Sequence, residues 1–310
     1  MSAKHLLGPL VRGLGIDGMV RRLYARRRVT IVIYHDPDPE TLRAHLAYYA
    51  RRYRFVTLDA VADALDGGRW DSLPDYPLVV TIDDGHRGNL DLGALLQRHG
   101  VRPMIYLCSQ VVGTERPYWW KTPAARTLGA EALKRLPDEE RRRRLAEAGN
   151  DPDAPHSDSP EPQAMSWDEA RAFAAVADYG GHTRHHPILT RCCDVRAADE
   201  IGTCRDEVEA EIGLPCRHFA YPNGDYGPRE RALLLRYGYR TGRTVEPGWN
   251  GPDADPYQLK AFPISDDAPV SWLAVQLTGL PAALRSLKGA WRGKTTDKAA
   301  SAGITMANPS

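Results

Sequence analysis

The sequence has few cysteines, no long apolar run and almost no net charge. Its five cysteines are odd in number and contain no C-x-x-C pair, which argues against a disulfide framework and favours buried free thiols. No stretch approaches the roughly 20 apolar residues that a membrane-spanning helix needs. The formal net charge is +1 over 310 residues, so bulk charge does not indicate nucleic-acid binding. What is present is 42% hydrophobic residues, ample for the core of one large domain.

The two ends of the chain differ from its middle. Residues 1–28 carry seven Lys/Arg and a single acid, and they lack the apolar run and cleavage site of a signal peptide, so we expect a cytoplasmic protein. Residues 271–310 combine a basic amphipathic segment with a polar tail that we expect to be disordered. Basic amphipathic segments bind anionic membranes, and terminal helices also pack on barrel ends. Peripheral contact with the inner face of the membrane and simple packing therefore both stay open.

Apolar strands alternate with amphipathic helices from residue 29 onward. The alternation predicts a parallel sheet, closed into a barrel. Residues 115–165 interrupt it as an inserted helical segment that begins with three aromatics, Tyr118-Trp119-Trp120, suited either to stacking on sugar rings or to core packing. The alternation of strands and helices resumes at Ser166, which is predicted to form a capping box with Glu169. Strands are predicted at 29–34, 55–58, 78–82, 104–107 and 239–245, and helices at 40–52, 90–99, 166–177, 199–212 and 228–236.

Asp83 and Asp84 end the buried strand 78–82 and precede Gly85. Parallel α/β folds place their active sites at the carboxyl ends of strands. Because neighbouring strand residues point to opposite sides, one carboxylate can bind a metal while the other faces a substrate water. Taken alone, the pair is equally compatible with a strand-end cap or a turn.

His182 and His186 form the second group of candidate residues, four positions apart after a pair of glycines. Imidazole is the commonest metal-binding side chain, and two His with one carboxylate leave coordination positions open for water and substrate. A polar surface loop would explain the histidines alone. Their combination with an acid pair at another strand end of the same barrel favours a catalytic metal site.

At these residues the chain resembles a known family. T-I-D-D-G at 81–85 and H-T-R-H-H-P at 182–187 resemble the T-F-D-D-G and H-[S/T]-x-x-H motifs of the polysaccharide deacetylases with a NodB homology domain. The resemblance covers about residues 29–265, with Ile82 in place of the usual Phe. It implies an α/β fold, a distorted (β/α) barrel of about seven parallel strands spanning residues 29–270. It also implies a metal-dependent hydrolase that removes N-acetyl groups from a saccharide.

The resemblance also implies a role for each motif residue. Asp83 corresponds to the catalytic base, and the metal ligands correspond to Asp84, His182 and His186. His185 falls at a variable position and is not assigned to the metal. The His/carboxylate set favours zinc, with cobalt, nickel or manganese as alternatives.

Phe219-Ala220-Tyr221-Pro222 resembles the motif that forms one wall of the substrate groove. By this resemblance Tyr221 and Pro222 bind substrate, with the Tyr221 backbone N–H aimed at the developing oxyanion. Arg217 corresponds to the arginine that pairs with the base, although a plain surface charge is an equal alternative at this spacing.

The family's late Leu-x-His acid is missing, because no His follows His218. Val32-Ile33-Tyr34-His35 is similar to the first strand of a circularly permuted branch that deacetylates poly-N-acetylglucosamine. That branch supplies its acid from this strand, so His35 is the expected general acid and His86 a weaker substitute. The first and last strands of a closed barrel are neighbours, so either can supply the group.

Three functions remain open at this point. The first is N-deacetylation of a saccharide, with a lipid-linked or nucleotide-linked precursor expected inside the cell. The second keeps the fold and hydrolyses a non-polysaccharide amide, as some relatives do. The third is a catalytically inactive carbohydrate-binding relative, which the complete set of candidate catalytic residues disfavours.

Overall fold

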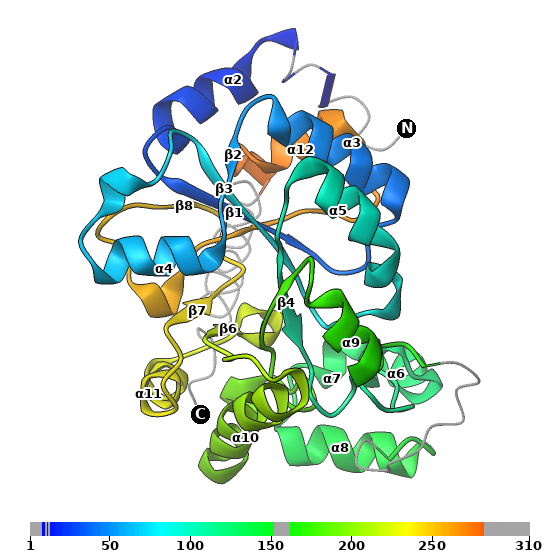
Figure 1. The fold of residues 1–310 in the computed structure, drawn as a ribbon. Coiled ribbons are helices and arrows are strands. Elements are labelled where there is room, and N and C mark those ends of the chain that lie inside the picture. The colour runs from blue at the N-terminus through cyan, green and yellow to red at the C-terminus, as the bar shows by residue number, and fades with distance from the viewer. Residues whose placement is uncertain (1–7, 10, 12, 152–161, 282–310) are drawn as a thin grey trace, which may run out of the picture.

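The computed structural model describes residues 8–9, 11, 13–151 and 162–281. Its core is a single curled sheet of nine strands with the order β7-β6-β5-β4-β3-β1-β8, in which β2 pairs with β3 and β9 with β1 (Figure 1). All pairings are parallel except that of β8 with β1. The strands are β1 Val29–Tyr34, β2 Arg54–Phe55, β3 Pro77–Ile82, β4 Met104–Leu107, β5 Asp178–Gly181, β6 His218–Ala220, β7 Thr241–Arg243, β8 Trp249–Asn250 and β9 Phe262–Pro263.

Most helices connect strands and cover the outside of the sheet (Figure 1), whereas helix α4, Leu58–Asp66, packs Leu58 and Val61 in one cluster with inward-facing strand residues. The α-helices are α2 Ile16–Val20, α3 Pro39–Ala50, α4 Leu58–Asp66, α5 Gly93–His99, α6 Pro123–Leu128, α7 Ala130–Leu133, α8 Asp138–Glu147, α9 Trp167–Phe173, α10 Asp194–Ile212, α11 Pro228–Arg236 and α12 Val270–Gln276. The π-helical turn η1, Arg21–Ala25, continues α2 directly. Among the described residues, no helix is both long and apolar enough to cross a membrane.

The sheet curls until its two ends meet at residues 259–264. Leu259 donates its N–H to the Gly242 carbonyl at 2.9 Å, beside β7, and Ile264 donates to the Ile33 carbonyl of β1 at 3.0 Å. β9 itself pairs with β1 in parallel. The predicted fold, a distorted (β/α) barrel with an inserted helical segment, is confirmed.

Side chains that alternate between the two faces of the strands divide the hydrophobic core into two clusters. Val29, Ile31 and Ile33 of β1 share one cluster with Val79 of β3 and Ala220 of β6, strands that are not all neighbours. Side chains of successive strand residues point to opposite faces, so this cluster fills the inside of the curl. The intervening residues of β1 and β3 pack outward against the helices. Burial on both faces explains why β1 and β3 are apolar almost throughout.

Local sequence signals set most element boundaries. Ser166 and Glu169 form the predicted capping box of α9, which nevertheless ends at Phe173 rather than near 177. Thr57 caps the helix α4 by accepting the Ala60 N–H at 3.2 Å. The helix α4 therefore starts at Leu58, and the strand predicted at 55–58 is limited to β2, Arg54–Phe55. The three-aromatic segment is buried at Tyr118 and Trp119, so core packing explains those two rings.

The terminal segments pack on the barrel in part. Val11 and Ala25 are buried, and Leu273 and Leu277 of the C-terminal amphipathic segment lie in the main core. Leu273 and Leu277 are therefore unavailable to a membrane, whereas Leu280 of the same segment is 40% exposed. The predicted disordered tail, and the amphipathic residues after 281, lie outside the described residues.

Candidate active site at the strand ends

Asp83 and Asp84 turn away from each other directly after β3. Asp83 continues the strand pairing, since its N–H donates to the Tyr34 carbonyl of β1 at 2.9 Å. Asp84 has a φ of 76°, a left-handed conformation that is uncommon outside glycine and that marks functional turns. Gly85 follows with a φ of 79°. Both carboxylates are buried, at 4% and 3% exposure, so each needs a polar partner.

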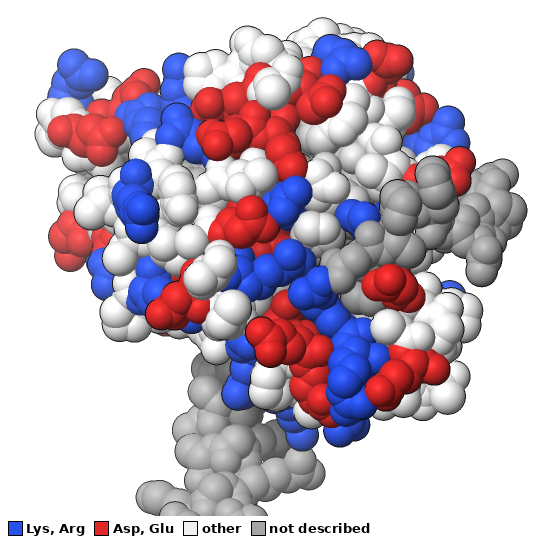
Figure 2. Space-filling view, turned by 90° about the horizontal axis from the view of Figure 1, so that it is seen from below, with Lys and Arg blue, Asp and Glu red and all other residues white. Residues whose placement is uncertain are grey.

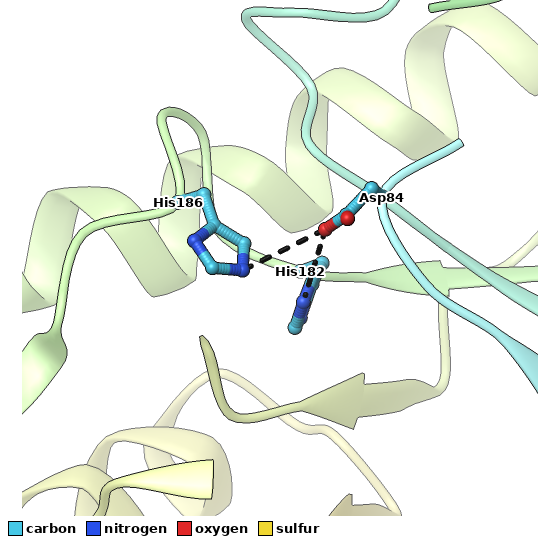
Figure 3. Close-up of side chains that lie close together, drawn as sticks. All are labelled: Asp84, His182 and His186. Carbon is cyan, nitrogen blue, oxygen red and sulfur yellow. Dashed lines mark ion pairs between the residues drawn. The ribbon is translucent and has the colours of Figure 1, made fainter. Parts of the chain in front are cut away.

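Three side chains from two loops converge on one point, as Figure 3 shows. The Oδ1 atom of Asp84 lies 3.5 Å from Nε2 of His182 and 3.6 Å from Nε2 of His186. Candidate ligand atoms of the three residues all lie within 4.8 Å of one another. Oδ1 is buried and accepts no hydrogen bond. A buried carboxylate oxygen that accepts no hydrogen bond and faces two ring nitrogens is suited to binding a metal ion.

The protonation state of His182 suits a metal ligand. Its Nδ1 lies 2.7 Å from the Ala220 carbonyl, which only accepts hydrogen bonds, so Nδ1 carries the proton and Nε2 keeps its lone pair. Burial lowers the pKa of His182, which keeps the ring neutral. Burial disfavours the charged form of Asp84, yet the hydrogen bond from His86 and the neighbouring imidazoles hold the pKa of this carboxyl well below its usual value. A carboxylate and two neutral imidazoles fit a first-row divalent metal.

The loop that carries both histidines is held by a buried glutamate from α10. Glu200 is fully buried and accepts the N–H groups of Arg184 and His185 at 2.7 and 2.9 Å. The same carboxylate lies 2.8 Å from Nδ1 of His185, so the His185 ring is directed toward Glu200 and not toward Asp84. Thr183 accepts the His186 N–H at 2.9 Å, and both residues have positive φ. The loop geometry therefore depends on Glu200, outside the motif, as well as on Thr183 within it.

Asp83 contacts an arginine from the other side of the barrel. Nη2 of Arg243, at the end of β7, lies 2.6 Å from Oδ1 of Asp83. The Arg243 side chain is fully buried, so the pair is shielded from solvent. This arginine was missed in the sequence, although a charged residue inside the predicted strand 239–245 was a usable signal, because a buried charge requires a partner.

Arg217 does not pair with Asp83, and that expectation is wrong. Its guanidinium lies 3.7 Å from Asp59, and it precedes β6, whereas Asp83 follows β3. Parallel strands place residues before them and after them at opposite ends of the sheet. Arg243 occupies the position beside Asp83.

Tyr221 and Pro222 are both buried, and Tyr221 is committed to internal contacts. The Tyr221 N–H donates to the Arg243 carbonyl at 3.1 Å, and its hydroxyl donates to the Tyr257 carbonyl at 3.0 Å. The expectation that this N–H faces the oxyanion is therefore corrected: the N–H belongs to the sheet. The turn that follows, with Asn223 at a φ of 58°, is the exposed part of this motif.

The inserted segment supports the metal-site residues directly. The Tyr118 hydroxyl donates to the Asp84 carbonyl at 3.2 Å, and Nε1 of Trp119 donates to the His186 carbonyl at 2.9 Å. The Trp120 ring centre lies 4.3 Å from that of His186. Residues 118–120 thus hold the backbones of two candidate ligands in place. The sequence placed these aromatics in the insertion but did not connect them to the site.

The two candidate acids lie in different environments. His86 is 3% exposed, with Nε2 3.3 Å from Oδ2 of Asp84 and Nδ1 3.4 Å from Nζ of Lys121. It orients Asp84 and has little access to substrate. His35 follows β1 with an exposed side chain, and its N–H donates to Asp266 at 3.1 Å. Its strand is paired with β3, so it lies at the same sheet edge as Asp83.

A pH effect on stability follows from the buried imidazoles. Burial lowers the pKa of His186 to about 3 from its ordinary 6.5. Between these values the unfolded chain binds the proton and the native protein does not, so the free energy of unfolding falls as pH drops below about 6.5. We expect metal-free protein to lose about 2 kcal/mol through this group between about pH 7 and pH 5, measured by urea unfolding. A His186→Gln variant should show a shallower slope, and an unchanged slope would contradict this assignment.

Comparisons with known proteins agree with this geometry. The polysaccharide deacetylase family model matches residues 71–242. IcaB from Ammonifex degensii is 19% identical, with a TM-score of 0.59 over 81% of this chain and 97% of that one. The Streptococcus pyogenes deacetylase PplD, solved with acetate, is 14% identical with a TM-score of 0.58 over 81% and 98%. A de-N-acetylase from Aggregatibacter actinomycetemcomitans is 15% identical with a TM-score of 0.58 over 81% and 100%. No curated protein matches the chain.

Proposed function

This chain belongs to the polysaccharide deacetylase family, and from that premise we propose that it is a metal-dependent hydrolase that removes N-acetyl groups from an amino-sugar-containing saccharide. One observation carries the proposal. The unpartnered Oδ1 of Asp84 faces Nε2 of both His182 and His186, and a second buried carboxylate lies beside them. A carbohydrate-binding relative without activity would have no need to bury this set, since burial of charged groups is costly.

Asp84, His182 and His186 would hold the metal, and we propose zinc, with cobalt, nickel or manganese as alternatives. A divalent metal in such a site polarises the substrate carbonyl and makes water a better nucleophile. His86 and the Ala220 carbonyl orient Asp84 and His182 from behind, at 3.3 Å and 2.7 Å. Such supporting contacts keep ligand atoms aimed at one point.

We propose Asp83 as the general base. It is adjacent in sequence to Asp84, and its Oδ2 lies 3.9 Å from Nε2 of His182, so it borders the metal-binding set without belonging to it. Arg243 contacts its carboxylate from inside the barrel and restricts its orientation. A positioned base of this kind removes the proton of the attacking water as the carbon–oxygen bond forms.

We expect His35→Ala to lower the rate of N-acetyl hydrolysis by about 10² to 10⁴-fold, because a general acid must protonate the amine as it leaves. The loss should be much smaller on an aryl acetate ester, whose leaving group needs no proton, and bound metal should be unchanged. Rates of both substrates and metal content measure this. His86→Gln is the comparison variant, expected to affect metal content instead, since it contacts Asp84. Equal losses on both substrates would remove His35 as the acid.

The substrate class is tested by acetate release. We propose a precursor sugar in the cytoplasm, either lipid-linked or nucleotide-linked. The support for this compartment is that all five cysteines are free, as expected in a reducing environment. Purified protein loaded with zinc would be screened against sugar nucleotides, lipid-linked sugars and N-acetylglucosamine oligomers, with cyclic amides as the competing class. Acetate from any N-acetyl sugar supports the proposal, and turnover of the amides alone would replace it.

A further inference from the structure

The N-terminal helical segment presents apolar side chains to solvent. In α2 and η1, Ala25 is buried against the barrel, whereas Met19 and Leu23 are 55% and 67% exposed. These two residues are four apart and therefore lie on the same helix face. Leu14, just before α2, is 67% exposed as well. We call Leu14, Met19 and Leu23 the outward apolar face, and Figure 1 places its helix at the top edge of the molecule.

An arginine-lined cavity of about 340 Å³ borders the same helical segment. We call it the arginine pocket, defined by Arg21 of η1 and by Arg51, Arg52 and Arg54 from the end of α3 and the start of β2. Arg21 stacks at 4.3 Å over the ring of Tyr76, which also lines the pocket. Two segments distant in sequence therefore gather four guanidinium groups in one place.

These four arginines lack acidic partners. No ion pair joins any of them to a described residue, and the hydrogen bonds of Arg21 and Arg54 go to backbone carbonyls. The Nε of Arg21 is buried without a hydrogen-bond partner.

The one acid in the pocket wall, Asp75, is already engaged. Arg26 contacts it at 3.1 Å and Arg27 at 3.2 Å. The pocket therefore has an excess of positive charge, and guanidinium groups bind phosphate particularly well.

The pocket lies at the end of the strands opposite to the candidate active site. Arg54 begins β2 and Tyr76 comes directly before β3, while Asp83 follows the six residues of β3, a length of roughly 20 Å. A large surface bound at the pocket would leave the active-site end of the barrel free.

We propose that the outward apolar face and the arginine pocket together dock this protein onto an anionic phospholipid bilayer. Met19 and Leu23 would enter the headgroup region while the four guanidinium groups bind lipid phosphates, the combination used by interfacial helices. Charge complementarity favours this end of the molecule. On the opposite face, seen from below in Figure 2, basic and acidic side chains are interspersed. The proposal does not depend on the deacetylase activity.

Vesicle flotation of the full chain tests the charge component. We expect binding to vesicles that contain phosphatidylglycerol and little to phosphatidylcholine alone. Arg51→Gln with Arg54→Gln should weaken binding by about 30-fold, given the usual contribution of each basic residue near such a surface. Arg143→Gln with Arg144→Gln on α8 removes the same charge from a site where both arginines pair with glutamates, and should leave binding unchanged. Equal loss in both variants, or equal binding to the two vesicle types, would overturn the proposal.

The apolar component has its own matched pair. Met19→Ser with Leu23→Ser should weaken binding at least about tenfold, because apolar burial contributes to insertion. Val195→Ser with Leu235→Ser removes comparably exposed apolar side chains from α10 and α11 at the other end of the molecule, and should have no effect. Acetate release from a soluble substrate should be unchanged in all four variants. No vesicle binding by the parent protein would refute docking even if the enzyme is active.

Discussion

His182→Ala should remove most of the bound metal and lower acetate release by at least about 10³-fold, since the metal's charge stabilisation is worth several kcal/mol. Its Nε2 faces the unpartnered Oδ1 of Asp84, and the ring is held by the Ala220 carbonyl. Asp84→Ala should have the same effect, because it removes the only carboxylate in the three-residue set. Metal content after chelation and reloading, measured beside the rate, tests both variants.

His185→Ala is the matched control for the metal prediction. It removes an imidazole from the same loop, but its Nδ1 lies 2.8 Å from Glu200 and not in the metal-binding set. We expect the variant to keep its metal, with a stability loss that thermal unfolding would report. Full metal content in His182→Ala, or metal loss equal to that of His182→Ala in the control, would refute the assignment of ligands.

Asp83→Asn should bind metal normally and lower turnover by about 10² to 10⁴-fold, the usual contribution of a positioned general base. The amide oxygen still accepts a hydrogen bond from Arg243, so the fold should survive, whereas removal of the whole side chain would leave a buried arginine unpaired. Substrate affinity should change little, because only proton removal is affected. The expected pattern is therefore a low kcat with normal metal content.

Two results would contradict the assignment of the base. Near-parent turnover in Asp83→Asn would move the role to another residue, and loss of metal would make Asp83 a ligand. Arg243→Gln helps to separate these outcomes. This variant keeps the Asp83 carboxylate but removes its hydrogen bond from Arg243. We therefore expect a smaller loss of kcat than in Asp83→Asn, together with a loss of stability and with the metal retained.

The strands could be predicted because their burial is visible in their composition. β1 and β3 are buried along their whole length, and their apolar residues indicated this directly. The helix ends were predictable where a nearby side chain caps them, as at Ser166, and less so after Phe173, where the distant Arg102 donates to the last carbonyls. Asp84, His182 and His186 could be grouped because parallel strand ends meet at one edge of a sheet.

The partners of these residues come from positions that no local pattern connects. Arg243 reaches Asp83 across the barrel interior, 160 residues away in sequence. Motif spacing indicated Arg217 instead, although it precedes its strand and so lies at the other end. Tyr221 has a backbone N–H like any other residue, and only the pairing of β6 with β7 assigns that N–H to Arg243.

The barrel, the acid motif, the histidine motif and hence the family follow from the sequence alone, because they depend on periodicity and on residues close together in the chain. The tertiary structure alone decided which groups support the site: Arg243 on Asp83, Glu200 under the histidine loop, and Tyr118 and Trp119 on the ligand backbones. It also brought four arginines from two segments into one pocket. Contacts between distant segments depend on how the sheet curls and closes, and that closure is a property of all its strands together.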